Sequence, residues 1–486
     1  MKTITIDPIT RLEGHGKITI FLNDTGDVQN AYLQIPELRG FERFAQGRRA
    51  EDMPQITSRI CGVCPVAHHM AATKALDAAY HAHPPPPAQK LRELLYCGYL
   101  IYDHILHFYF LGGPDFIVGP DAPPAKRNIL GVLEKAGLDV GKDVIKHRAY
   151  GQQITAILGG KATHPVCGIP GGVTKGLTTD DVQKIRPMIA SCKTFAAFTL
   201  KLFDETVLQN TDYLALIKSD GFTLRTYNMG LVDKKNHVAF YDGTIRVTDP
   251  DGNEHLTFPA NDYASHIAEH VEPYSYMKFP YLKALGWHGL TDGKTSGIYR
   301  VGPLGRLNAA DGMATPHANK EYTRLMETLG RPVHSTLAFH WARLIELLYA
   351  TERAQELIDD PHITSTQIRV PVGKPGEGVG VVEAARGTLI HHYQLTPDGL
   401  IKKANLIVAT TNNAGAITMS VRDAAKAVIH KGVVTDGLLN RIEMAFRAYD
   451  PCFGCATHTL PGGMPLSVDI YDAHKNLIHT YSQNLS

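Results

Sequence analysis

Residues 59–80 read Arg-Ile-Cys-Gly-Val-Cys-Pro-Val-Ala-His-His-Met-Ala-Ala-Thr-Lys-Ala-Leu-Asp-Ala-Ala-Tyr. Pro65 suits the first position of a helix, because the N–H that proline lacks has no intrahelical partner there. The Ala-rich stretch from Pro65 to Tyr80 predicts that helix. Cys64 then becomes the N-cap, and its thiol lies at the positive end of the helix dipole, where the thiolate is favoured. The stretch therefore predicts a metal-binding or redox-active cysteine pair at a helix start.

A second cysteine pair of the same spacing stands near the other end of the chain. Residues 450–458 read Asp-Pro-Cys-Phe-Gly-Cys-Ala-Thr-His, so that two cysteines are again followed by a histidine. Four thiolates in two C-x-x-C pairs most often bind a structural zinc ion or an iron–sulfur cluster. A thioredoxin-like redox pair is disfavoured, because one C-x-x-C would suffice for it. Since almost the whole chain separates the two pairs, the entire fold must close around the metal.

Composition limits the classes of protein to consider. The chain has 486 residues, 44% of them hydrophobic, and its 49 Lys and Arg against 48 Asp and Glu leave a net charge of +1. No basic surface for nucleic acid is indicated, and no apolar run is long enough to span a membrane. The chain has seven cysteines, an odd number and a small one for its length, which argues against a disulfide framework. With no signal peptide recognisable at the N-terminus, a cytoplasmic location is expected.

Outside the cysteine motifs, helices dominate. Helices are expected at residues 90–110, 180–208 and 340–358. Strands are expected at 17–22 and 31–35 around a polar turn, at 237–241 and 244–247 around Asp242-Gly243 as a two-residue hairpin, and at 466–471 and 477–481. No repeat or linker is evident, so the fold class predicted is α+β, mainly α, in a single multi-lobed unit spanning residues 1–486.

Seven motifs along the chain match one family in order. They are Arg11-Leu12-Glu13-Gly14-His15, Arg39-Gly40-Phe41-Glu42, Arg59-x-Cys61-Gly62-x-Cys64-x-x-x-His68, Asp103-His104-x-x-His107-Phe108-Tyr109, Ala385-Arg386-Gly387, Ala409-Thr410-Thr411-Asn412 and Asp450-Pro451-Cys452-x-x-Cys455-x-x-His458. Together they resemble the motifs of nickel-iron hydrogenase large subunits. The resemblance covers nearly the whole chain, and it overturns the initial preference for zinc. It implies a central bundle of long helices with small peripheral β hairpins and sheets.

The resemblance implies a catalyst of reversible heterolytic H₂ cleavage, with a metal centre on the four cysteines. All four would bind nickel, with Cys61 and Cys452 terminal, and with Cys64 and Cys455 bridging to an iron that carries cyanide and carbon monoxide. Soft thiolates suit nickel in an incompletely filled, redox-active coordination sphere. The protons and electrons from H₂ must then leave the site by separate routes.

Further residues acquire roles from the same resemblance. Glu13 would carry protons away from Cys452, and His68 would hydrogen-bond a bridging thiolate. Asp103, Arg386 and Asp450 would form a polar cap over the site, since a buried Arg needs carboxylate partners. Thr410 would donate a hydrogen bond to a cyanide ligand.

A separate Mg²⁺ site is implied near the end of the mature chain. Glu42, the backbone carbonyl of Leu406 and the imidazole of His458 would hold the ion, and hard oxygen ligands suit it. Maturation in this family removes a tail after that histidine, so residues 459–486 are expected to be a C-terminal extension cut off by an endopeptidase. One departure from the pattern is Ala385, which stands where many family members have proline.

Several segments resemble the cytoplasmic subgroup of the family, which includes viologen-reducing, heterodisulfide-reductase-linked enzymes and NAD-reducing bidirectional ones. They are residues 121–128, 169–173, 274–282 and 301–306, and residues 104–111 lean toward the first type. Cys97, Cys167 and Cys192 match no role and are expected to be buried small hydrophobes. Electrons must therefore leave through an iron–sulfur small subunit, with further electron-transfer subunits of the heterodisulfide-reductase or NAD/flavin type.

Two alternatives of other kinds stay open at this point. A hydrogenase-fold protein could bind structural zinc in its four-cysteine site, or could have lost its activity, like the related quinone-reducing respiratory subunits. Glu13, Arg386 and Asp450 argue against the first alternative, because a structural site needs neither a proton relay nor a polar cap. The four retained cysteines argue against the second.

Overall fold

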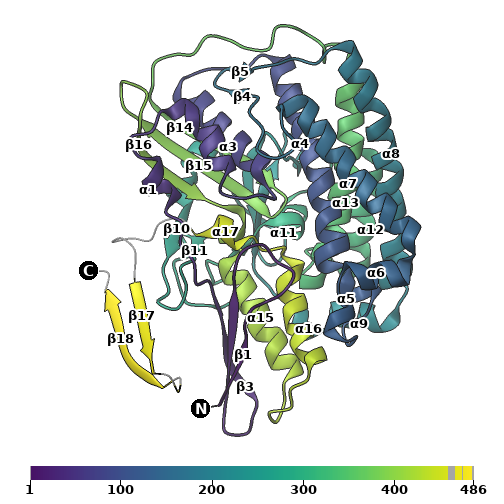
Figure 1. Cartoon of the computed structure of the whole chain (residues 1–486), viewed down its shortest axis with the longest axis vertical. Helices are drawn as coiled ribbons and strands as arrows, with labels where there is room; N and C mark the ends of the chain where they lie inside the picture. The colour runs from purple at the N-terminus through teal and green to yellow at the C-terminus, as the bar shows by residue number, and fades with distance from the viewer. Residues whose placement is uncertain (1, 458–465, 473, 475, 484–486) are drawn as a thin grey trace.

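A bundle of long helices forms one side of the molecule (Figure 1). The computed structural model describes residues 2–457, 466–472, 474 and 476–483. Four helices make up the bundle: α4 (Pro86–Leu106), α7 (Leu138–Gly159), α8 (Thr179–Phe203) and α13 (Phe339–Ile358). Helices α4 and α8 each pack against both α7 and α13, so that the four close a ring, and α12 (Pro316–Leu329) covers α13. The predicted bundle of long helices is confirmed.

The local sequence explains where these helices begin and end. Pro86 occupies the first turn of α4, and the side chains of Thr178 and Asp181 form a capping box at the start of α8. Helices α4 and α8 continue into π-helical turns, η2 (His107–Gly112) and η4 (Asp204–Leu208). Turns of this kind are frequent at functional sites, and η2 begins one helical turn after Asp103.

On the other side of the molecule, α3 (Pro65–Ala79) packs on a three-stranded antiparallel sheet, β14 (Glu377–Ala384), β15 (Gly387–Leu395) and β16 (Ile401–Ile407). The helix approaches the sheet closely because glycines face it. A Cβ atom at Gly378 would lie 2.3 Å from the Ala75 carbonyl oxygen, and one at Gly380 would lie 2.1 Å from that of Ala71. The Ala-rich composition of α3 thus serves a close helix–sheet contact, and it places the start of α3 against β15.

A larger sheet corrects one expectation from the sequence. Strands β7 (His237–Val238) and β8 (Thr244–Thr248) do not form a hairpin with each other, because β6 (Tyr227–Val232) lies between them and pairs with both. Every residue of β6 is buried, so this strand takes the central position, where both of its edges find partners. The Asp242-Gly243 segment instead connects two strands across β6, and β9 (Glu254–Phe258) extends the sheet beyond β8.

The N-terminal strands form a third sheet of β1 (Lys2–Ile6), β2 (Lys17–Leu22) and β3 (Val28–Gln34), which confirms the first predicted hairpin. Helix α15 (Ala414–Val428) packs on β3 and on α16 (Asp436–Ala448). Short elements connect these parts: α1 (Phe41–Ala45), α2 (Met53–Ser58), α5 (Pro114–Ile117), α6 (Ile129–Ala136), α9 (Thr211–Lys218), α10 (Tyr263–His266), α11 (Gly302–Ala309), α14 (Ala409–Asn412), α17 (Phe453–Ala456), β4 (Gly168–Ile169), β5 (Gly172–Val173), β10 (Ile267–His270), β11 (Phe279–Leu282), β12 (Tyr299–Arg300) and β13 (Gly312–Met313).

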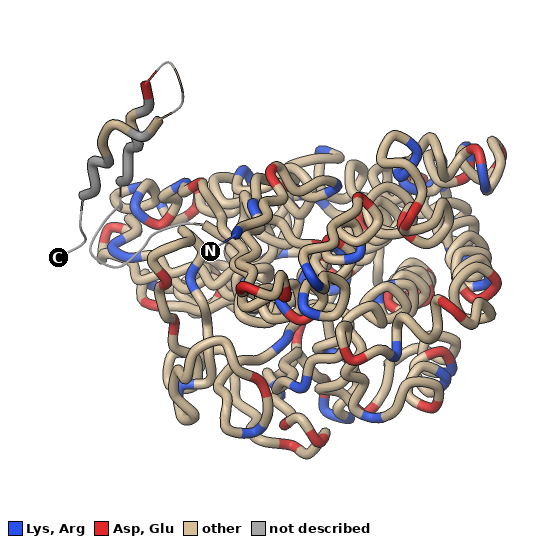
Figure 2. Tube along the Cα trace, turned by 90° about the horizontal axis from the view of Figure 1, so that it is seen from below, with Lys and Arg blue, Asp and Glu red and all other residues tan. Residues whose placement is uncertain are grey.

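The last described strands, β17 (Leu466–Tyr471) and β18 (Leu477–Gln483), pair with each other as predicted and stand away from the body in both views (Figures 1 and 2). Basic and acidic residues are interspersed along the chain (Figure 2), in keeping with the near-zero net charge. Within the described part of the chain, no helix combines the length and the apolar character that crossing a membrane requires.

Candidate metal centre

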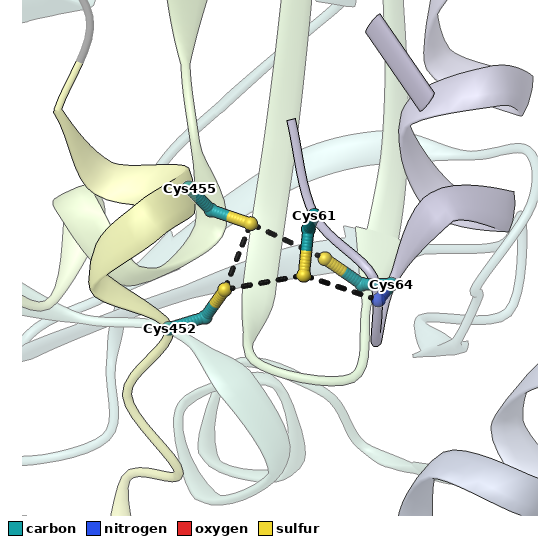
Figure 3. A group of neighbouring side chains, drawn as sticks. All are labelled: Cys61, Cys64, Cys452 and Cys455. Carbon is teal, nitrogen blue, oxygen red and sulfur yellow. Dashed lines mark hydrogen bonds between the residues drawn. The ribbon is translucent and has the colours of Figure 1, made fainter. Parts of the chain in front are cut away.

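Two helix starts carry the four cysteines and lie against each other in the interior (Figure 3). Cys64 is the N-cap of α3, as the sequence predicts, and Cys452 is the N-cap of α17. Figure 3 shows the sulfur atoms of Cys61, Cys64, Cys452 and Cys455 pointing toward one another. The two motifs at opposite ends of the chain therefore form one site.

The four sulfur atoms make a compact group. The Sγ atoms of Cys61 and Cys452 are 3.4 Å apart, as are those of Cys64 and Cys455, and those of Cys452 and Cys455 are 2.8 Å apart. All four lie within 4.8 Å of one another, and no cysteine of the group is more than 5% exposed. This arrangement offers a metal four soft ligands from two sides.

Burial and the neighbouring thiols shift the pKa values of the four cysteines in different directions. Burial raises the pKa of Cys452 and of Cys455 well above the usual thiol range. Hydrogen bonds from the neighbouring thiols, Cys452 first, lower the pKa of Cys61 well below it. Four buried thiolates at this spacing repel one another, and a metal cation supplies the charge that holds them together. The donor set thus fits a soft transition-metal ion.

Glu13 reaches the sulfurs from a segment that runs beside Cys452. The thiol of Cys452 donates to Glu13 Oε2 at 2.9 Å, and the Gly454 N–H donates to the same oxygen at 3.1 Å. The Phe453 N–H also donates to the Glu13 backbone carbonyl oxygen at 2.9 Å. Burial, followed by the charge of Cys61, raises the pKa of Glu13. A carboxyl group in this position is within hydrogen-bond reach of the sulfur for proton exchange.

Arg386 lies between two aspartates above the sulfur group. Its guanidinium nitrogens lie 3.1 Å from Asp103 Oδ2 and 2.9 Å from Asp450 Oδ2, and all three side chains are buried. Burial alone would lower the pKa of Arg386, but the two carboxylates outweigh it and raise that pKa. Arg386 is therefore a fixed positive charge at the site. Burial raises the pKa of Asp450 to about 7.

The space between these groups is a small cavity with unused hydrogen-bonding capacity. Its lining consists of Cys64, His68, Ala384, Arg386, Leu389, Val408, Ala409, Thr410, Cys452 and Cys455. The Thr410 hydroxyl accepts a hydrogen bond from the Cys452 N–H at 3.0 Å. Within the described residues, His68 Nε2 and Arg386 Nε are buried without a hydrogen-bond partner. Since buried polar atoms normally have partners, these atoms fit a metal group whose own ligands accept hydrogen bonds.

Side chains hold the turn that carries Arg386. The position in question is Ala385, where the family pattern often has a proline. The Ala385 N–H donates to the Tyr99 hydroxyl oxygen at 3.0 Å, a bond that proline cannot make. Arg306 donates to the carbonyl oxygens of Ala384 at 2.9 Å and Ala385 at 3.2 Å. Ala385 therefore does not leave this turn loose.

We expect the change Arg306→Met to destabilise the protein by about 3–5 kcal/mol, because it leaves two buried carboxylates, Glu346 and Glu383, without their cation. The measurement is the midpoint of thermal unfolding of the purified complex. The matched control is Arg353→Met, which breaks a half-exposed pair with Glu93 and costs about 1 kcal/mol or less. Equal shifts in the two variants would contradict this account of the buried ion pairs.

The residues expected to hold Mg²⁺ are brought together in part. The Leu406 N–H donates to Glu42 Oε1 at 2.6 Å, and both residues are buried. His458 lies outside the described residues. Cys97, Cys167 and Cys192 are buried, as expected, and none of them belongs to the sulfur group.

One residue near the site is missed by reasoning from the sequence. His391 belongs to none of the sequence motifs, but it is fully buried and its Nε2 lies 3.2 Å from Nδ1 of His68. Successive side chains of a strand point to opposite faces, and this alternation along β15 is the sequence signal that could have identified His391. It turns His391 inward and leaves His392 half-buried.

Comparison with known proteins agrees with this geometry. A family model described as nickel-dependent hydrogenase matches residues 39–127 and 200–458, and one described as HoxL-like matches residues 3–38. An iron-sulfur subunit of the F420-non-reducing hydrogenase of Archaeoglobus profundus is 46% identical over 483 residues, which are 99% of this chain and 99% of that protein. The NAD-reducing hydrogenase HoxS subunit beta of Cupriavidus necator is 39% identical over 495 residues, covering 98% of this chain and 99% of that protein.

The solved structures agree as well. The crystal structure of an NAD⁺-reducing NiFe hydrogenase in the H₂-reduced state has a TM-score of 0.89 at 38% sequence identity, covering 94% of this chain and 100% of that one. The Ni-Fe-Se hydrogenase of Desulfovibrio vulgaris Hildenborough has a TM-score of 0.74 at 25% identity, with 94% and 100% covered. A structural zinc site and a lost activity are therefore not favoured. The chain belongs to the nickel-dependent hydrogenase family and is the large subunit of a nickel-iron hydrogenase, an oxidoreductase that acts on H₂.

Proposed function

We propose that all four cysteines bind nickel, with Cys61 and Cys452 as terminal ligands and with Cys64 and Cys455 bridging to an iron that carries cyanide and carbon monoxide. The observation that carries the proposal is the meeting of four buried sulfurs with Glu13, which contacts Cys452, and with Arg386, which lines the same cavity as three of the cysteines. When bound, such a centre supplies an open coordination position at which H₂ is split heterolytically.

In this proposal Glu13 removes the proton. Its Oε2 atom lies 2.9 Å from the sulfur of Cys452, which is within the distance for direct proton transfer. The Gly454 N–H holds the carboxyl group in that orientation. The raised pKa of Glu13 favours a group that both takes up and releases a proton under working conditions.

The polar cap holds the diatomic ligands in the same proposal. Arg386 donates hydrogen bonds into the cavity while Asp103 and Asp450 fix its guanidinium plane. The Thr410 hydroxyl donates to a cyanide, and His68 donates to a bridging thiolate. Arg386, Thr410 and His68 all line the same cavity.

We also propose that Glu42, the Leu406 carbonyl and His458 bind Mg²⁺. The support is the buried Glu42 carboxylate beside the Leu406 backbone, which offers a hard oxygen ligand of the kind Mg²⁺ prefers.

Electrons leave, in our proposal, through an iron–sulfur small subunit. Among the described residues, metal-ligating side chains gather in no group other than the four cysteines. The electrons would then pass to further subunits of the heterodisulfide-reductase or NAD/flavin type, in line with relatives whose names describe F420-non-reducing and NAD-reducing hydrogenases. The cytoplasmic location expected from the sequence stays a prediction.

Residues 459–486 are, in this proposal, a C-terminal extension that an endopeptidase removes during maturation. The hairpin of β17 and β18 stands away from the body, so that its removal would leave the bundle and the other sheets intact (Figures 1 and 2).

Elemental analysis of the native complex tests the metal assignment. We expect one nickel for each large chain, and iron in excess of the amount that the clusters of the partner subunit contain. Zinc without nickel, in protein from which the tail has been removed, would contradict the proposal and would return the site to a structural role.

A further inference from the structure

A chain of three buried side chains leads away from the metal centre behind His68. His68 Nδ1 lies 3.2 Å from His391 Nε2, and His391 Nδ1 lies 2.6 Å from the Tyr393 hydroxyl. All three side chains are 0% exposed. His391 and Tyr393 are two residues apart on β15 and so face the same side of the sheet, where α3 carries His68.

Such a chain has only two arrangements of its protons, because a neutral imidazole has one N–H and one lone pair. If Tyr393 donates to His391, then His391 donates to His68, and the proton of His68 is on Nε2. If Tyr393 accepts instead, every bond reverses and His68 Nε2 is left as a bare lone pair. The hydroxyl at the far end of the chain thus determines what His68 offers to the cavity.

One observation favours the first arrangement. His68 lines the cavity next to three cysteines, and its Nε2 has no partner among the described residues. A bare lone pair facing sulfur lone pairs would have no favourable interaction there, whereas an N–H would find an acceptor.

The surroundings of Tyr393 are consistent with its role as a donor. Burial raises the pKa of Tyr393 well above its usual value, so that the hydroxyl keeps its proton. The Thr57 hydroxyl, which hydrogen-bonds Tyr393, donates its own proton to the Met53 carbonyl oxygen at 2.7 Å.

We propose that Tyr393 and His391 are positioning residues that hold the proton of His68 on Nε2 and so make His68 a hydrogen-bond donor to a bridging sulfur of the metal centre. The proposal rests on the function proposed above for His68. A hydrogen bond to a thiolate withdraws electron density from the sulfur, and through it from the metals. Tyr393 and His391 therefore tune the electron density of the centre through His68, without contacting the sulfurs themselves.

The test uses the variant Tyr393→Phe in the holo complex and reads the infrared stretching bands of the iron-bound carbon monoxide and cyanide. We expect the carbon monoxide band to move to lower wavenumber, because the sulfur donates more charge when the hydrogen bond is lost, while the nickel content stays at the wild-type value. The matched control is Tyr322→Phe, in which a buried hydroxyl that donates to the Ala310 carbonyl oxygen is lost. Unchanged bands in Tyr393→Phe with full nickel loading would overturn the proposal.

A double-mutant cycle separates this effect from general loosening of the site. In a His68→Gln background, Tyr393→Phe should cause no further shift, because the chain acts through His68. An equal shift in both backgrounds would overturn the proposal. Should Tyr393→Phe fail to assemble, His391→Gln and His391→Leu replace it. The glutamine amide donates to His68 without help from Tyr393 and should keep the wild-type band, while leucine should lower it, and a wild-type band in His391→Leu would overturn the proposal.

The wild-type spectrum keeps this result distinct from the proposed function. A wild-type complex with nickel but without these infrared bands would refute the proposed iron ligands alone. The same variants would then be compared by the electron paramagnetic resonance of nickel, and an identical signal in Tyr393→Phe and wild type would overturn the role of Tyr393.

Discussion

Cys455→Ser is expected to abolish H₂ uptake by the complex and to lower the nickel content of the large chain. The sulfur of Cys455 lies 3.4 Å from that of Cys64 and 2.8 Å from that of Cys452, so that it faces both cysteine pairs. A serine oxygen is a hard donor that keeps its proton, and nickel in a site of this kind requires soft thiolates. The loss should exceed the roughly 10–100-fold effect of changes behind the metal ligands.

The measurements for this variant are H₂-dependent reduction of a viologen dye and nickel per chain. Cys192→Ser is the matched control, because Cys192 is also buried but lies in α8, away from the sulfur group. It should keep both nickel and activity. A Cys455→Ser complex that retained both would show that this sulfur does not hold the metal.

Glu13→Gln should lower net H₂ oxidation by about 10²–10⁴-fold, the range that general acid–base catalysis contributes. The amide keeps the shape of the side chain and its contact with the Gly454 N–H, but it cannot take up the proton of the Cys452 sulfur. Splitting of H₂ within the site should persist. Interconversion of the nuclear spin isomers of H₂ measures that splitting, while exchange of D₂ with solvent protons measures proton exit and should be lost.

The pH dependence gives a second readout of Glu13. Burial raises its pKa above the ordinary value of about 4.3 for a glutamate. The carboxylate form, which accepts the proton, therefore disappears as the pH falls through this raised value, and the rate of H₂ oxidation should fall with it. That limb should be missing in Glu13→Gln. Glu37→Gln is the control, since Glu37 is a nearby carboxylate that bonds the His15 N–H at the surface. Wild-type turnover in Glu13→Gln would remove Glu13 as the relay.

The sequence predicts the parts of this protein that depend on local chemistry. Pro65 and the Ala-rich run behind it specify the start and the course of α3, and the two C-x-x-C motifs identify the sulfur ligands. The helix is confirmed and the four sulfurs lie together, because helix propensity and residue type are both contained in a short stretch. That these sulfurs hold the metal stays a prediction.

Long-range pairing is what the sequence leaves open. The turn Asp242-Gly243 has the composition of a hairpin, but β6, which precedes both strands in the chain, pairs with both of them and is buried throughout. His391 is hidden for a related reason, since only the contact between α3 and β15 reveals that an inward-facing histidine meets His68.

The pairing of Glu13 with Cys452 joins residues that are 439 positions apart, and Cys61 with Cys452 joins residues 391 apart. Contacts of such sequence separation form slowly, because a long loop must close before they yield any stabilisation. During synthesis the second cysteine pair leaves the ribosome only after the residues from the first pair up to Cys452 have been made. Cys61 and Cys64 at the start of α3 therefore lack their partner cysteines through most of translation. When the second pair packs against them, the complete set of four ligands forms, and metal binding at that step stabilises the folded chain.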